Sequence, residues 1–143
     1  MTTSEQLNQV FCDNFVAYFR SHTAHINITG RNFRSDHKLL QGVYERRQAQ
    51  IDMIGELLRT LGVFMPISIA EILMCSEIAD TDVEGTADDL LTLVCDDLER
   101  LKECYEELMT TADEEGHRDI ANYAQDQVLD IAKSIWMLTS TLD

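Results

Sequence analysis

Two histidines and two carboxylates occur at spacings that could hold a metal ion. His25 and His37 flank the glycine turn of "HINITGRNFRSDH", and Asp52 and Glu56 follow in the next segment. Glu56 follows Asp52 by four positions, so on a helix the two acids share one face. Asp52 also interrupts the apolar run "AQIDMIGELL", where a buried carboxylate would be costly unless it were paired or bound to metal. Mixed imidazole and carboxylate ligands suit Fe(II), and also bind Zn or Mn.

One chain cannot bring these four residues to a single ion. His25 and His37 lie near the tip of a predicted helical hairpin and can approach one another, but His37 and Asp52 are fifteen residues apart on one predicted helix. At the rise of an α-helix this is a separation of roughly 22 Å. If two copies pack antiparallel about residues 44–45, the histidines of each meet Asp52 and Glu56 of the other, in an isologous dimer with two sites.

The elements that would position these residues are helices. The chain has one proline and six glycines, and its apolar residues recur at helical spacing. We predict a first helix that ends near residues 29–30, where glycine would supply a left-handed C-cap. Its predicted packing face is Phe11, Phe15, Tyr18, Phe19, His22 and Ile26.

The second predicted helix is capped by Asn32 or Ser35 and stops at Gly62. A short helix follows from about Pro66 to Cys75.

Two more long helices are expected. Thr86 would cap a helix whose stripe runs from Ala87 to Leu108, residues 111–119 would form a turn, and the last stripe runs from Ile120 to Leu138. Four long helices with one short helix in the middle connection predict an all-α, ferritin-like four-helix bundle, with residues 1–143 as a single domain.

Composition and charge narrow the classes of function. The chain of 143 residues is 45% hydrophobic, without the apolar run of about 18 residues that a membrane span needs. The segment "MTTSEQLNQVFCDNF" has no basic start and no apolar core of a signal peptide, so we expect a cytoplasmic protein. The formal net charge of −15 argues against binding nucleic acid through a basic face.

Two further compositional features leave alternatives open. Residues 80–115 hold fourteen acidic residues against two basic ones, which is either a solvated helix face or a surface that concentrates cations. The cysteines are not spaced as C-x-x-C, and we expect reduced buried thiols rather than disulfides or zinc ligands. They are Cys12, Cys75, Cys95 and Cys104.

The metal-binding pattern closely resembles that of the Dps proteins, the ferritin-like mini-ferritins of prokaryotes. The resemblance rests on "HINITGRNFRSDH" followed by Tyr44, Asp52 and Glu56, with the acids starting fifteen residues beyond the second histidine. It extends to "LGVFMPISIAEILMCSEI" and to "EEGHRDIANYAQDQVLDIAKSIWMLTSTL", and so covers about residues 5 to 142.

The resemblance implies a hollow dodecamer with ferroxidase sites at its twofold interfaces. Such a protein oxidises Fe(II) with hydrogen peroxide or O2, stores ferric mineral inside, and protects DNA indirectly by removing iron and peroxide together. By this resemblance His25 and His37 come from one subunit, and Asp52 and Glu56 from its twofold mate. Glu56 would be the principal carboxylate, and Asp52 would support the second iron.

The chain departs from the family pattern near the histidines. Many members have Trp directly after the first histidine, but this chain has Ile26. Many also have an acidic residue four positions after the second histidine, where this chain has Gln41, a weaker iron partner. His22 is either an accessory group or alternative ligand, or simply a packed, hydrogen-bonded histidine. The alternative function is therefore a non-enzymatic cage with a degraded or zinc-binding site.

Two acidic features receive other interpretations. Glu114 and His117 spell the E-x-x-H of di-iron bundles, but Gly116 places them in a turn, and we do not assign them to a metal site. The resemblance places the same turn at a threefold pore, where Asp113, Glu114, Glu115 and Asp119 would guide iron. The Lys-rich tails of DNA-binding family members are absent, so direct DNA binding is not expected.

Overall fold

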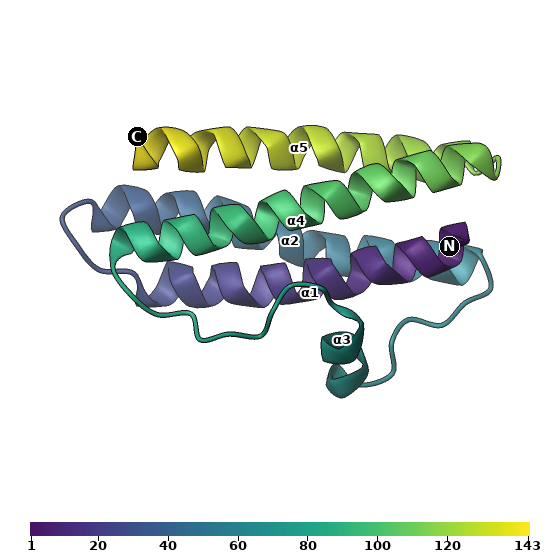
Figure 1. The fold of residues 1–143 in the computed structure, drawn as a ribbon, viewed down its shortest axis with the longest axis horizontal. Coiled ribbons are helices and arrows are strands. Elements are labelled where there is room, and N and C mark those ends of the chain that lie inside the picture. Colours follow the sequence, from purple (N-terminus) through teal and green to yellow (C-terminus); the bar gives the residue numbers. More distant parts are fainter.

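Five helices and no strand make up residues 1–143, all of which the computed structural model describes. The helices are α1 (Thr3–Asn27), α2 (Phe33–Thr60), α3 (Ile69–Cys75), α4 (Ala87–Glu114) and α5 (Arg118–Leu142). The four long helices form one bundle, and α3 lies outside it against α1 (Figure 1). The predicted all-α bundle with a short extra helix is confirmed.

Two helical hairpins build the bundle. α1 packs along α2, α4 packs along α5, and the hairpins join chiefly through α1 and α4. The connection that carries α3 runs back along the bundle, so α2 and α4 point in the same direction (Figure 1). One long crossover of this kind is typical of ferritin-like folds.

Local signals set most helix ends. Thr86 caps α4 as predicted, because its side chain accepts from the backbone N–H of Asp89 at 3.1 Å while the Asp89 carboxylate accepts from the N–H of Thr86 at 2.9 Å. Gly62 and Gly116, with φ of 77° and 82°, follow the ends of α2 and α4 in the left-handed region that favours glycine.

Three predicted boundaries shift. The first helix ends at Asn27 with an extended C-cap, so the glycine at position 30 is not its cap. The short helix begins only at Ile69, because the Ser68 side chain accepts from the N–H of Glu71 at 3.1 Å and forms the N-cap there. The turn predicted at 111–119 narrows to 115–117, since the Gly116 C-cap reverses the chain at once.

The predicted packing face of α1 is only partly correct. Phe11 is buried and Phe15 packs against the core, but Phe19 and Ile26 are 59% and 62% exposed. Several other buried positions of α1 carry smaller side chains, because α1 lies between α2 and α4 and must approach both closely. They include Leu7, Val10, Asn14, Ala17, Ser21 and Ala24. No helix combines the length and the apolar character needed to cross a membrane.

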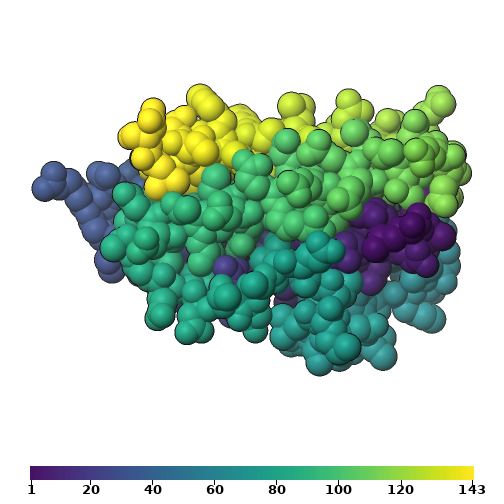
Figure 2. Space-filling model, in the orientation of Figure 1, coloured from purple at the N-terminus to yellow at the C-terminus, as the bar shows by residue number.

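Charged side chains fasten the long connection to the bundle. Arg20 is 5% exposed; it donates to the Asp97 carboxylate and to the Thr81 carbonyl oxygen, both at 2.7 Å. Asp13 is fully buried and accepts from the Ser76 hydroxyl group and the Glu77 N–H at 2.9 and 2.8 Å. Figure 2 shows this connection lying over α1.

The cysteines are free thiols, as expected, with Cys75 only half-buried. Burial raises the pKa of Cys12, Cys95 and Cys104 above the usual range of a thiol. Since the thiolate is the form that binds metal, these buried sulfurs are poor metal ligands.

Candidate metal centre

His25 and His37 form a closely matched pair between the last turn of α1 and the start of α2. Their rings are stacked, with centroids 3.8 Å apart and an interplanar angle of 13°. Nδ1 of His25 donates to the backbone carbonyl oxygen of His37 at 2.7 Å, and Nδ1 of His37 donates to that of His25 at 2.8 Å. His25 is 5% exposed. We call this pair the imidazole half-site.

The reciprocal hydrogen bonds determine the tautomer of both rings. A carbonyl oxygen can only accept, so each Nδ1 carries the proton and each Nε2 keeps a free lone pair. Metal-binding histidines commonly use this arrangement, which also fixes the ring orientation. Both Nε2 atoms of the imidazole half-site are therefore available as possible metal ligands.

The neighbours of His37 on α2 add little charge to this half-site. The ring of Phe33 stacks on His37, with centroids 5.0 Å apart. Gln41, one turn beyond His37, donates from its amide to the carboxylate of Glu45 at 2.9 Å. Glu45 thus holds the amide of Gln41.

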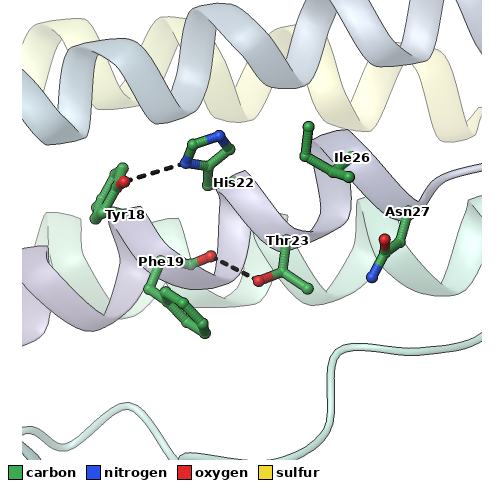
Figure 3. Close-up of a pocket in the computed structure, with 6 residues that line it drawn as sticks. All are labelled: Tyr18, Phe19, His22, Thr23, Ile26 and Asn27. Carbon is green, nitrogen blue, oxygen red and sulfur yellow. Dashed lines mark hydrogen bonds between the residues drawn. The ribbon is translucent and has the colours of Figure 1, made fainter.

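His22 is both packed and hydrogen-bonded within the chain. Its Nδ1 lies 3.1 Å from the Tyr18 hydroxyl oxygen, and its ring stacks on Tyr44 with centroids 3.9 Å apart (Figure 3 shows the hydrogen bond). The ring centroid of Tyr44 in turn lies 5.0 Å from the ring centroid of His25. Tyr18 is not among the residues predicted for the site, although its i, i+4 spacing to His22 is a usable signal.

Asp52 and Glu56 lie further along α2, and we call them the carboxylate half-site. Both are exposed and line an open concavity together with Ile51, Gly55 and Met65. Neither carboxylate has an ion pair or hydrogen bond within the chain. Asp52 was expected to be costly in an apolar run, but it is solvated in the single chain, because this face of α2 points away from the bundle core.

The two half-sites are separated as the helix geometry requires. His37 and Asp52 belong to the continuous helix α2, so fifteen residues place them roughly 22 Å apart along its axis. No three His, Cys, Asp or Glu side chains of one chain converge to hold a metal ion. A complete site with both kinds of ligand needs a second copy of the chain.

One of the four acidic residues at the turn between α4 and α5 is hydrogen-bonded to the start of α1. Asp113, Glu114 and Asp119 are exposed, but Glu115 accepts hydrogen bonds from the N–H and the hydroxyl group of Thr3. These bonds lower the pKa of Glu115. Glu114 ends α4, whereas the other member of the E-x-x-H pattern precedes α5, so the two do not share a helix.

The fold and this arrangement of ligands match known proteins. The model of the ferritin-like domain matches residues 4–143. The chain is 29% identical over 143 residues to the DNA protection during starvation protein of Helicobacter pylori (strain J99 / ATCC 700824), which covers 99% of both chains. It is 35% identical over 139 residues to antigen TpF1 of Treponema pallidum (strain Nichols), covering 96% of this chain and 78% of the antigen.

The chain belongs to the Dps family of ferritin-like proteins. The crystal structure of TpF1 matches with a TM-score of 0.92 at 34% identity, over 99% of this chain and 91% of that one. The Dps protein of Vibrio cholerae O1, described as a member of a broad superfamily of ferritin-like diiron-carboxylate proteins, matches with a TM-score of 0.93 over 99% and 89% of the two chains. At 22% identity this last likeness shows the shared Dps fold alone.

Proposed function

We propose that this Dps-family chain oxidises Fe(II) with hydrogen peroxide or O2 and stores the ferric product inside a dodecameric shell. Each site would join the imidazole half-site of one subunit to the carboxylate half-site of its twofold mate. Iron is the substrate and cargo here, and Zn or Mn would occupy the same ligands as substitutes.

The observation that carries this proposal is the state of the two half-sites. The imidazole half-site presents two free Nε2 atoms, whose tautomers are set by the 2.7 and 2.8 Å bonds to carbonyl oxygens. Asp52 and Glu56 have no partner in their own chain. Two neutral imidazoles and two carboxylates form a donor set that suits Fe(II), with a net charge that offsets the charge of the metal.

An uncovered apolar surface supports the twofold contact. Large apolar side chains stay exposed on α1, on α2 and in the segment that follows α2. They include Phe19, Ile26, Met53, Phe64 and Met65. Exposed apolar side chains favour an interaction site when they gather on one surface, and a second copy packed about the middle of α2 would cover them while joining the half-sites.

The charge of the chain favours iron uptake. With a net charge of −15 per subunit, a shell of many copies would raise the local Fe(II) concentration. The exposed Asp113, Glu114 and Asp119 at the α4–α5 turn could line a threefold entry, while Glu115 is held by Thr3. The same charge disfavours direct binding of DNA, so protection of DNA would come from the removal of iron and peroxide.

Peroxide-dependent oxidation of Fe(II) in a Glu56→Gln variant tests the proposal. The change keeps the shape of the side chain and removes its charge, and we expect oxidation at low iron loading to fall by about a hundredfold. Glu99→Gln is a matched control, because it removes the same charge from an exposed position on α4. Light scattering would show that both variants keep the mass of the wild-type shell.

The outcomes separate the proposed function from its rivals. Loss of oxidation in Glu56→Gln alone supports an inter-subunit ferroxidase. Equal rates in all three proteins would exclude this site. Metal binding without oxidation in the wild-type protein would instead support the non-enzymatic, zinc-binding cage.

A further inference from the structure

Tyr18 and His22 form a dyad of phenol and imidazole beside the imidazole half-site. The Tyr18 hydroxyl group donates to Nδ1 of His22 at 3.1 Å when the neutral ring carries its proton on Nε2. Both side chains come from the same side of α1 and are half-buried, next to a hollow of about 270 Å³ that Ile26 also lines (Figure 3). Such a phenol has a proton acceptor in place before any reaction begins.

Aromatic rings connect this dyad to His25. His22 stacks on Tyr44 with centroids 3.9 Å apart and an interplanar angle of 8°, and Tyr44 lies 5.0 Å from His25. The His22 ring is also only 6.1 Å from the His25 ring. The Tyr18 phenol is therefore connected to His25, a candidate metal ligand, through a series of neighbouring rings.

The proposed reaction needs an electron source when only one iron is bound. Reduction of hydrogen peroxide to water takes two electrons, and a single Fe(II) supplies one. Gln41 is neutral and donates to Glu45, so the second iron lacks a carboxylate at this position. If only one electron is delivered, the O–O bond breaks to give hydroxide and a hydroxyl radical, which would damage the protein and its surroundings.

We propose that Tyr18, with His22 as its proton acceptor, is the second electron donor to peroxide at a site that holds one iron. This inference rests on the proposed ferroxidase function. Fe(II) is oxidised to Fe(III), the Tyr18 phenol loses one electron and becomes a neutral phenoxyl radical, and its proton passes to Nδ1 of His22. Hydrogen peroxide takes up both electrons and two protons from solvent, its O–O bond breaks, and two water molecules form.

The dyad is restored by the substrate itself. The next Fe(II) gives one electron to the phenoxyl radical, the proton returns from His22 to the Tyr18 oxygen, and a second Fe(III) results. In sum two Fe(II) ions are oxidised per peroxide, as in a reaction with both irons bound. The dyad thus allows the two irons to react in sequence at a site whose second position is weak.

Freeze-quench electron paramagnetic resonance of the intact protein tests this role. Wild-type protein would be loaded with one Fe(II) per imidazole half-site and mixed with hydrogen peroxide, and a tyrosyl signal is expected that narrows when the tyrosines are ring-deuterated. Tyr18→Phe should lose this signal and release more hydroxyl radical to a spin trap. His22→Gln keeps a hydrogen-bond acceptor but not a base, and should slow radical formation by about a hundredfold.

Tyr123→Phe is the matched control. Tyr123 is also a hydrogen-bonded, largely buried phenol, but it donates to the amide oxygen of Gln50 at 2.7 Å and lies beside Tyr105, so no base receives its proton. This variant should give the wild-type signal. A full signal in Tyr18→Phe, or its loss in Tyr123→Phe, would overturn the dyad while iron oxidation by the wild-type protein still supported the ferroxidase. A wild-type protein that oxidises no iron would overturn both.

Discussion

The two halves of the candidate site differ in how far one chain completes them. In the imidazole half-site His25 and His37 are stacked and hydrogen-bonded, with His25 almost fully buried. In the carboxylate half-site Asp52 and Glu56 are exposed and without partners. Both belong to the same bundle, and helix α2 contributes to each of them.

This difference has a physical reason. An imidazole must present one particular nitrogen to a metal, so its tautomer and orientation have to be set in advance. A carboxylate has equivalent oxygens and can turn to meet a metal, but it is costly to bury alone. Under the proposed function, Asp52 and Glu56 stay solvated in the single chain and would be covered only when a partner chain supplies the other metal ligands, which avoids this cost. The half-sites are thus prepared in the way that suits the chemistry of each ligand.

The largest expected effect comes from breaking the imidazole half-site. In the double variant His25→Ala/His37→Ala, oxidation of Fe(II) should fall by at least about a hundredfold, since even outer partners of a metal site account for 10–100-fold. Loss of the two hydrogen bonds should also lower the free energy of unfolding by about 2 kcal/mol. Stopped-flow oxidation and denaturant unfolding would measure the two effects. An unchanged rate would show that iron is oxidised elsewhere.

Both effects should be smaller when Asp52 of the carboxylate half-site is changed. Asp52→Asn is expected to slow oxidation by about tenfold, because Asp52 would support the second iron. Its exposure predicts a change of less than about 0.5 kcal/mol in the free energy of unfolding. The same two measurements would be applied. A large loss of stability would mean that Asp52 has a structural role that the single chain does not show.

A smaller effect is expected when a carboxylate is added to the imidazole half-site. Gln41→Glu removes the 2.9 Å bond to Glu45 and places two like charges one turn apart, which should cost about 0.5 kcal/mol of stability. Binding of a second iron should become tighter, and isothermal titration with Fe(II) under anaerobic conditions would count the ions. If the count stayed the same, Gln41 would not be what weakens the second position.

The smallest effect concerns a carboxylate that, unlike Asp52 and Glu56, has partners in its own chain. Hydrogen bonds from Thr3 lower the pKa of Glu115. The stability that these bonds contribute is therefore present at pH values above the ordinary pKa of a glutamate, and it is lost as the pH falls through the lowered pKa. Thr3→Val should therefore destabilise the protein slightly at neutral pH, and the difference from wild type should vanish in acid. Thermal unfolding at several pH values would measure it. A difference that persisted in acid would point to packing of Thr3 instead.

Sequence patterns predicted how the candidate ligands are spaced along the helices, but not all of their surroundings. The glycine turn between His25 and His37 predicted their proximity, because two helices joined by a short turn bring their ends together. The spacing of His37 and Asp52 predicted their separation, because both lie on one helix of known rise. The aromatic stripe of the first helix misled, since Phe19 and Ile26 face away from the core.

The sequence by itself determined the helices, the positions of the possible ligands along them, and the distance between His37 and Asp52 on one helix. These are local or arithmetic properties, since they depend only on residue spacing and helical rise. Only the tertiary structure decided that Nδ1 of each histidine binds the carbonyl oxygen of the other, and that Tyr18, His22 and Tyr44 connect to them. Those contacts depend on how deeply and at what rotation α1 packs against α2, which no residue spacing specifies.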